Sequence, residues 1–194
     1  PAENPGDLGV RPELDALGPF RWSPSAASEW TLPGVDEMPR SLSDYRGRPV
    51  VVVFYLGYGC LHCAEQLKAI AKDYQSFREA GLEVIAISTD KQVNLKRALE
   101  NLEGGFPFPL AADPELGVFR KYRCYDDFEK VPLHGTFLVD AKGRVRWQDI
   151  SFEPFMNTQF LVKESKRLLS FEPETAPAVT VPITVLPAVT SAGR

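Results

Sequence analysis

The sequence predicts an α/β protein with a mixed central sheet flanked by helices. Two apolar, β-branched runs, Val50–Tyr55 and Leu82–Thr89, are typical of short strands buried on both faces. The segment between them has helical periodicity, and a strand–helix–strand succession implies a right-handed parallel crossover. Near the C-terminus, His134–Asp140 and Arg144–Ile150 flank a short turn, which predicts an antiparallel hairpin. Parallel and antiparallel strands together predict a mixed sheet covered by helices.

Further elements are expected between and after these strands. In the longest helical segment, Leu67, Ile70 and Phe77 fall on one apolar stripe, and charged residues occupy the rest. The predicted elements are a polar turn at Ser41–Pro49, a helix at Leu61–Ala80 stopped by Gly81, a helix at Lys91–Leu102, a short edge strand within Phe106–Pro114, a short helix at Glu115–Arg123 and a last helix at Phe155–Leu169.

The 194 residues fit one domain with extensions at both ends. Residues 1–19 are rich in proline and glycine and predict a loose arm, and residues 20–170 hold all the predicted elements. Residues 171–194 repeat proline, valine, threonine and alanine, and their prolines exclude a helix. We expect this tail to be either disordered or an extended strap over a surface.

Composition and charge exclude several classes of protein. With 44% hydrophobic and 25% charged residues, the chain resembles an ordinary soluble protein with a real core. Its 22 basic and 26 acidic residues give a net charge of 22 − 26 = −4, so no nucleic-acid partner is expected. No apolar run approaches the roughly 20 residues that span a bilayer. The chain begins with Pro1, which suggests processing or truncation and leaves a cytoplasmic or an exported location open.

Cysteine usage points to chemistry rather than to a disulfide framework. The chain has 3 cysteines, and two of them, Cys60 and Cys63, lie in one CLHC motif where a buried strand meets a helix. The positive end of a helix dipole stabilises a thiolate and lowers a cysteine pKa from about 8.5 to roughly 3.5–7.5. A cationic His62, between the two cysteines, would lower the thiol pKa further.

Three other interpretations of the motif compete with redox chemistry. A structural zinc site normally needs a second pair of ligands, which the sequence lacks. A c-type haem anchor needs histidine directly after the second cysteine, where Ala64 stands. An inert pair of core cysteines is the third. The context of strand, glycine, CxxC and amphipathic helix favours a redox pair, so we expect neither a metal nor a cofactor.

Most of the predicted domain resembles the alkyl hydroperoxide reductase and thiol-specific antioxidant family, the peroxiredoxins, within the thioredoxin-fold superfamily. The resemblance covers about residues 20–169 and implies a thioredoxin-like fold. Four segments carry it. Residues 20–55 resemble the family's opening segment with its first core strand, and residues 81–90 resemble its second core strand. Residues 106–122 resemble the region before the family's last strands, and residues 134–147 resemble its closing hairpin.

The family's active-site pattern is Pro-x-x-x-Thr-x-x-Cys, and it can be counted onto this sequence. Leu56 takes the Pro position, Cys60 the Thr position and Cys63 the position of the peroxidatic cysteine. The family's activating Arg falls at His134. The CxxC itself is similar to that of thioredoxin-type disulfide oxidoreductases, in which the first cysteine attacks and the second resolves.

The resemblance implies a thiol-dependent oxidoreductase, and two mechanisms remain open. In the peroxidase scheme Cys63 attacks a peroxide and Cys60 resolves the product, and a thiol electron donor then reopens the disulfide. In the disulfide oxidoreductase scheme Cys60 attacks a substrate disulfide and Cys63 resolves. A redox-inactive interaction module, whose tail straps a partner, is the third hypothesis. The family often pairs through sheet edges or faces, which implies a homodimer.

Two further residues have alternative interpretations. His134 is either a partly buried histidine bonded to the backbone, or a cation or proton donor that supports the cysteines together with His62. Cys124 is either a small buried apolar residue or a second resolving thiol.

Overall fold

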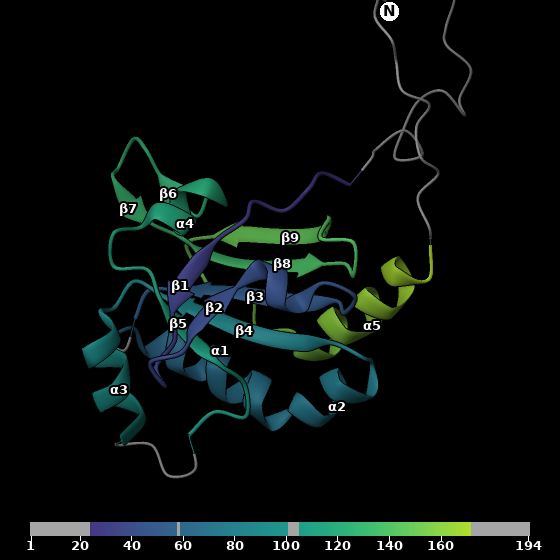
Figure 1. Ribbon diagram of the computed structural model, residues 1–194, viewed down its shortest axis with the longest axis horizontal. Coiled ribbons are helices and arrows are strands. Elements are labelled where there is room, and N and C mark those ends of the chain that lie inside the picture. The colour runs from purple at the N-terminus through teal and green to yellow at the C-terminus, as the bar shows by residue number, and fades with distance from the viewer. Residues whose placement is uncertain (1–23, 58, 101–104, 172–194) are drawn as a thin grey trace, which may run out of the picture. The chain divides into compact units, whose positions relative to one another are not determined.

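The computed structural model describes residues 24–57, 59–100 and 105–171. Its centre is a five-stranded sheet in the order β5–β4–β3–β8–β9 (Figure 1). The strands are β3 (Val50–Tyr55), β4 (Glu83–Ser88), β5 (Leu110–Ala112), β8 (His134–Val139) and β9 (Val145–Ser151). Strands β3, β4 and β5 pair in parallel, whereas β8 pairs antiparallel with both β3 and β9. The predicted mixed sheet, with its parallel crossover and closing hairpin, is confirmed.

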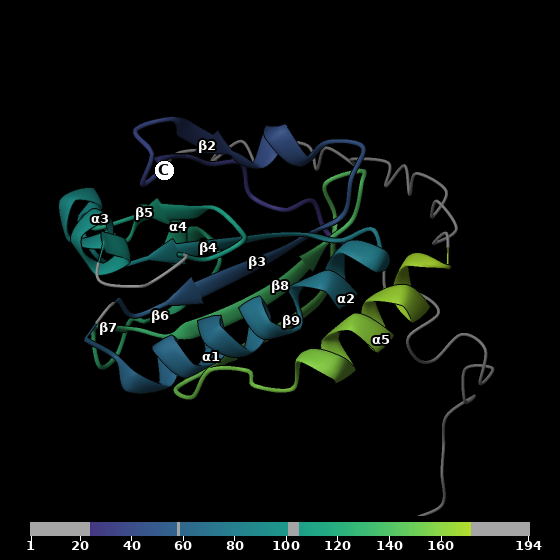
Figure 2. The ribbon, with the colours of Figure 1, turned by 90° about the horizontal axis from the view of Figure 1, so that it is seen from below.

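Helices cover one face of this sheet, and a hairpin with two short helices covers the other (Figure 2). Along β3, Val51, Val53 and Tyr55 pack toward the helical face, while the alternate residues pack into the opposite core. The helical face holds α1 (Leu61–Lys72), α2 (Tyr74–Glu79), α3 (Gln92–Glu100) and α5 (Thr158–Leu169). The other face holds β1 (Thr31–Pro33), β2 (Pro39–Ser41), the 3₁₀ helix η3 (Leu42–Tyr45) and α4 (Gly117–Lys121).

The helix predicted for residues 61–80 is in fact two helices. Asp73 separates α1 from α2, with backbone angles φ −95° and ψ 8°, and its side chain accepts a hydrogen bond from Thr158 Oγ1 on α5. Aspartate competes with the helix backbone for hydrogen bonds and therefore favours helix ends. The predicted stop is confirmed, because Gly81 follows α2 with a φ of 71°.

Two small hairpins were not anticipated from the sequence. They are β1–β2 and the pair of β6 (Tyr125–Asp126) with β7 (Val131–Pro132). Strands of two or three residues are too short to show an alternating pattern. The predicted polar turn at residues 41–49 contains the helix η3, which was also missed because four residues are too few to show a helical period.

The proposed arm, residues 1–19, and all of the proposed tail except Phe171 lie outside the described residues. The division into arm, domain and tail therefore stays a prediction. In the part of the chain that the structure describes, no helix is both long and apolar enough to cross a membrane.

Candidate active site

The CLHC motif lies where β3 ends and α1 begins. Between them the chain turns at Gly57, which is buried and has a φ of 99°. A Cβ atom at this position would lie 2.7 Å from Asp90 Oδ2, so both the backbone conformation and the available space call for glycine. This turn directs the chain from the core strand into the first turn of α1.

Cys60 is the N-cap residue of α1, and its Sγ accepts a hydrogen bond from the Cys63 amide at 3.2 Å. The two cysteines form a disulfide with their Cα atoms 5.2 Å apart, so the structure represents the oxidised protein. Their sulfurs lie at the positive end of the α1 dipole, where a thiolate is stabilised after reduction.

The two sulfurs differ in their surroundings. Cys63 is fully buried, and Leu56 donates its amide to Cys63 Sγ at 3.3 Å. Cys60 is only partly buried. A molecule that arrives from solvent therefore meets Cys60 first, whereas Cys63 makes the shorter contact with His134, 3.1 Å against 3.7 Å.

His134 completes the site from a distant part of the chain. It begins β8 and is buried, and its Nε2 lies 3.1 Å from Cys63 Sγ and 3.7 Å from Cys60 Sγ. Burial lowers the pKa of His134, and the backbone of Phe152 and the carboxylate of Glu153 only partly oppose this effect. The ring is therefore neutral at neutral pH. With the two sulfurs it forms a Cys₂His group whose ligand atoms all lie within 4.8 Å of one another.

The structure places His62 away from the sulfurs. Its side chain is 58% exposed on the first turn of α1, and its Nδ1 lies 2.9 Å from Glu153 Oε2. His134, rather than His62, contacts the sulfurs. A supporting role for His62 stays a prediction.

Gln66 is a site-supporting residue that the sequence reasoning missed. It lies one turn after Cys63, is 1% exposed, and donates to Phe155 O at 3.0 Å and to Thr136 Oγ1 at 3.4 Å. These bonds tie α1 to β8, the strand that carries His134. The available signal was a polar side chain on the apolar stripe of a predicted helix.

Cys124 lies on the other side of the sheet from Cys63. It packs in the core opposite the helices, beneath Gly135, where any Cβ would collide with its sulfur. Burial raises the pKa of the Cys124 thiol to about 12, and its Sγ donates only to the carbonyl of Tyr122. This environment fits a small buried apolar residue and does not fit a resolving thiol.

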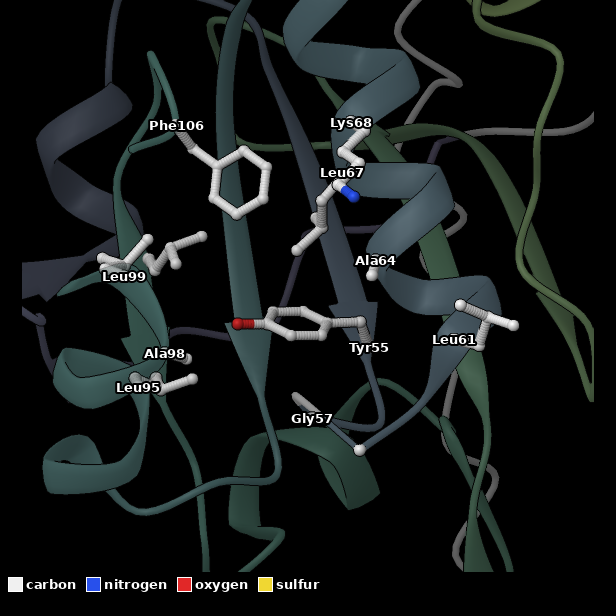
Figure 3. A pocket seen from close by; sticks show the side chains of 12 residues that line it. Tyr55, Gly57, Leu61, Ala64, Leu67, Lys68, Leu95, Ala98, Leu99 and Phe106 are labelled. Carbon is white, nitrogen blue, oxygen red and sulfur yellow. The ribbon is translucent and has the colours of Figure 1, made fainter. Parts of the chain in front are cut away.

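An apolar cavity of about 460 Å³ lies between α1 and α3, beside the loop that carries Cys60 (Figure 3). Gly59 and Leu61, which flank Cys60, contribute to its wall. The Tyr55 hydroxyl points into the cavity, and Lys68 lies at its edge. The rest of the wall is apolar and is formed by Ala64, Leu67, Leu95, Ala98, Leu99, Phe106 and Leu110.

Comparison with known proteins gives consistent matches to one family and one fold. The AhpC/TSA family model matches residues 25–148. A selenocysteine-containing peroxiredoxin, PrxU, from Peptoclostridium acidaminophilum is 33% identical over 118 residues, which are 58% of this chain and 58% of that protein. A chloroplastic peroxiredoxin Q from Oryza sativa subsp. japonica is 35% identical over 124 residues, 63% of this chain and 56% of that protein. The chain thus spans less than two thirds of the length of these relatives.

Among solved structures, AhpC from Enterococcus faecalis superposes with a TM-score of 0.68 at 19% sequence identity. The match covers 74% of this chain and 90% of that one. At this identity the likeness is one of fold, and it confirms the predicted thioredoxin-like architecture.

Proposed function

Because the chain belongs to the AhpC/TSA family, we propose that it is a thiol-dependent oxidoreductase that reduces peroxides through Cys60 and Cys63. The observation that carries this proposal is the convergence of three groups on Cys63 Sγ. They are the N-terminal end of α1, the Leu56 amide and His134 Nε2. Each of them stabilises negative charge on that sulfur after reduction.

In the first step, the Cys63 thiolate attacks one oxygen of the peroxide and the O–O bond breaks. The sulfur becomes a sulfenic acid, and the other oxygen leaves as an alkoxide or hydroxide that takes up a proton. His134 takes the place of the family's arginine, and as the Nε2–H tautomer it donates a hydrogen bond to the thiolate.

In the second step, Cys60 attacks the Cys63 sulfenic acid. The S–S bond forms and water leaves, which gives the disulfide seen in the structure. A dithiol donor then returns two electrons and two protons by thiol–disulfide exchange and is itself oxidised. The exposed side of the pair is Cys60, so the donor is expected to attack there.

The cavity beside Cys60 supports a substrate with an apolar organic part. Its wall is mainly aliphatic and aromatic, and it adjoins the loop that places the reactive sulfurs. We propose that the organic portion of an alkyl or aryl hydroperoxide occupies this cavity while the peroxide group approaches the cysteines.

A second function is favoured by one specific observation. Cys60 is the accessible sulfur and lies at the N-terminus of α1, as the attacking cysteine of a disulfide oxidoreductase would. In that scheme Cys60 attacks a substrate disulfide, and the buried Cys63 releases the reduced product.

Two serine variants separate these functions. Under the peroxidase scheme, reduced Cys60→Ser consumes one equivalent of hydrogen peroxide and accumulates a sulfenic acid, whereas Cys63→Ser consumes none. Peroxide loss and a sulfenic-acid probe measure this. If Cys63→Ser instead traps a mixed disulfide with a protein or small-molecule disulfide, and neither variant consumes peroxide, the oxidoreductase scheme holds. If neither assay shows thiol turnover, the remaining hypothesis is a redox-inactive interaction module.

The resemblance to the family also supports a homodimer. We propose that two copies of the chain pair in solution, and sedimentation analysis of the reduced and oxidised protein checks this. A monomer at all concentrations in both redox states would contradict it.

A further inference from the structure

The group formed by Cys60, Cys63 and His134 has a second chemical capacity that peroxide reduction does not use. Two thiolates and one imidazole are the ligands that zinc prefers, and two cysteines spaced C-x₂-C are a common half of a zinc site. In the described residues, this is the one group of three or more histidine, cysteine and acidic side chains whose ligand atoms converge.

The distances suit a tetrahedral ion once the disulfide is reduced. With Zn–S bonds of about 2.3 Å and Zn–N bonds of about 2.0–2.1 Å, ligand sulfur and nitrogen atoms lie about 3.6 Å apart. In the structure, Nε2 of His134 lies 3.1 Å and 3.7 Å from the two sulfurs. Reduction removes the S–S bond, so a small movement of the sulfurs apart is enough to admit an ion.

The ligands are also held by two separate elements, α1 and β8. Cys60 caps α1, Cys63 lies one turn into the helix, and His134 begins a core strand that pairs with β3 and β9. Both Cys63 and His134 are buried, while Cys60 borders solvent. An ion would therefore enter on the Cys60 side, where a water molecule would complete a four-coordinate site.

Two of the three ligands are the residues at which the sequence departs from the peroxiredoxin pattern. Cys60 stands at the family's threonine position and His134 at its arginine position. Neither threonine nor arginine would join a cysteine as a zinc ligand, so the same two changes create the donor set.

We propose that the reduced protein binds one Zn²⁺ through Cys60 Sγ, Cys63 Sγ and His134 Nε2. Both sulfurs bind as thiolates, so any proton that a thiol still holds is released as the Zn–S bonds form, and no electrons are transferred. A two-electron oxidant such as a peroxide converts the two thiolates to the disulfide and is itself reduced, and because the same sulfurs then form the S–S bond, Zn²⁺ is released. The site is thus a redox-dependent zinc site, independent of whether the pair reduces peroxides.

The test is a titration of the anaerobically reduced, full-length chain with Zn²⁺ against a chromophoric chelator. We expect one ion per chain in the dithiol form and none at this site in the oxidised form. Co²⁺ used as a probe should give the ligand-field bands of a tetrahedral site and a thiolate charge-transfer band. Cys60→Ser, Cys63→Ser and His134→Gln should each weaken binding by about 100-fold or more, since even loss of a residue that only orients a ligand costs about 10–100-fold.

His62→Asn is the matched control, because His62 lies on the same helix turn but outside the converging group. It should keep the wild-type affinity. Far-ultraviolet circular dichroism of each reduced, metal-free variant checks its folding. Unchanged affinity in His134→Gln, or equal binding by oxidised and reduced protein, would overturn the proposal. Peroxide consumption is measured on metal-free protein, so failure of the zinc site and failure of the peroxidase give separate results.

Discussion

Burial distinguishes the three thiols of this chain more clearly than their spacing does. Cys60 borders solvent at a helix N-terminus, Cys63 is enclosed beside His134, and Cys124 lies in the opposite core. A thiol becomes reactive when its thiolate is stabilised and reachable. This condition holds for the pair at α1 and fails for Cys124, whose pKa burial raises to about 12.

We therefore expect Cys124→Ser to affect stability and not chemistry. The serine hydroxyl would be buried beneath Gly135, where the Tyr122 carbonyl lies 3.8 Å from the present sulfur, and a poorly satisfied buried polar group costs about 1–3 kcal/mol. Urea denaturation should show this loss, while peroxide consumption per folded molecule stays at the wild-type rate. Cys124→Ala, which stays apolar, should lose less stability than the serine variant. A Cys124→Ser protein that is stable but slow to form its disulfide would instead show a resolving role.

At the scale of elements, the site depends on how α1 is attached. The turn at Gly57 orients its N-terminus, and Gln66 ties it to β8 and to the segment before α5. Helix α3 packs against the same face and forms the other wall of the apolar cavity. The catalytic pair and the proposed substrate cavity therefore share one helix.

A bulky side chain in the cavity should discriminate between peroxides. Ala98→Phe, on α3, fills part of the space that an aryl hydroperoxide would occupy (Figure 3). We expect kcat/KM for cumene hydroperoxide to fall by about 10-fold or more, because a misfit of one methylene in an apolar pocket is worth roughly 10–200-fold in kcat/KM. Hydrogen peroxide, which has no organic part, should react as before.

Val93→Phe provides the matched control for this variant. Val93 lies on the same helix but is 53% exposed and does not line the cavity. It should leave both substrates unaffected. Equal effects of Ala98→Phe on the two peroxides would place the organic group elsewhere.

At the scale of the whole molecule, the turn between β8 and β9 links the sheet to the last helix. Asp140 accepts bonds from the Lys142 and Arg144 amides and from the Arg144 guanidinium. Arg146, also buried, contacts Asp140 and donates to the carbonyls of Leu168 and Phe171 at the end of α5. Burial alone would raise the pKa of Asp140, but Arg144 and the turn amides outweigh it and lower that pKa.

A lowered carboxyl pKa makes stability depend on pH in the acid range. The contribution of Asp140 is complete above the unfolded pKa of about 4, and it is lost as pH falls through the lower folded value, because the unfolded chain takes up the proton first. At pH 7, Asp140→Asn should cost about 1.5–3 kcal/mol, the size of bonds to a charged group. Denaturant melts from pH 7 to pH 2 should show the difference in unfolding free energy between wild type and Asp140→Asn becoming smaller. A constant difference would mean that the carboxylate charge contributes nothing.

Much of the architecture was predictable because it depends on local patterns. The buried run Val50–Tyr55, the amphipathic stretch after Cys63 and the closing hairpin each carry their own periodicity. The break at Asp73 and the hairpins β1–β2 and β6–β7 were missed, since they depend on contacts with other elements or are too short for a period.

The sequence by itself determined the fold class, the family and the pair of cysteines at a strand-to-helix junction, because each depends on patterns among residues that are close in sequence. Only the tertiary structure decided which groups meet that pair. His134 is 71 residues from Cys63, and it reaches the sulfur because β8 pairs with β3, whose end leads into α1. Cys63 is fully buried in the folded protein, whereas Cys60 is only partly buried. Long-range strand pairing, which no local pattern encodes, therefore creates both the proposed peroxidatic environment and the third zinc ligand.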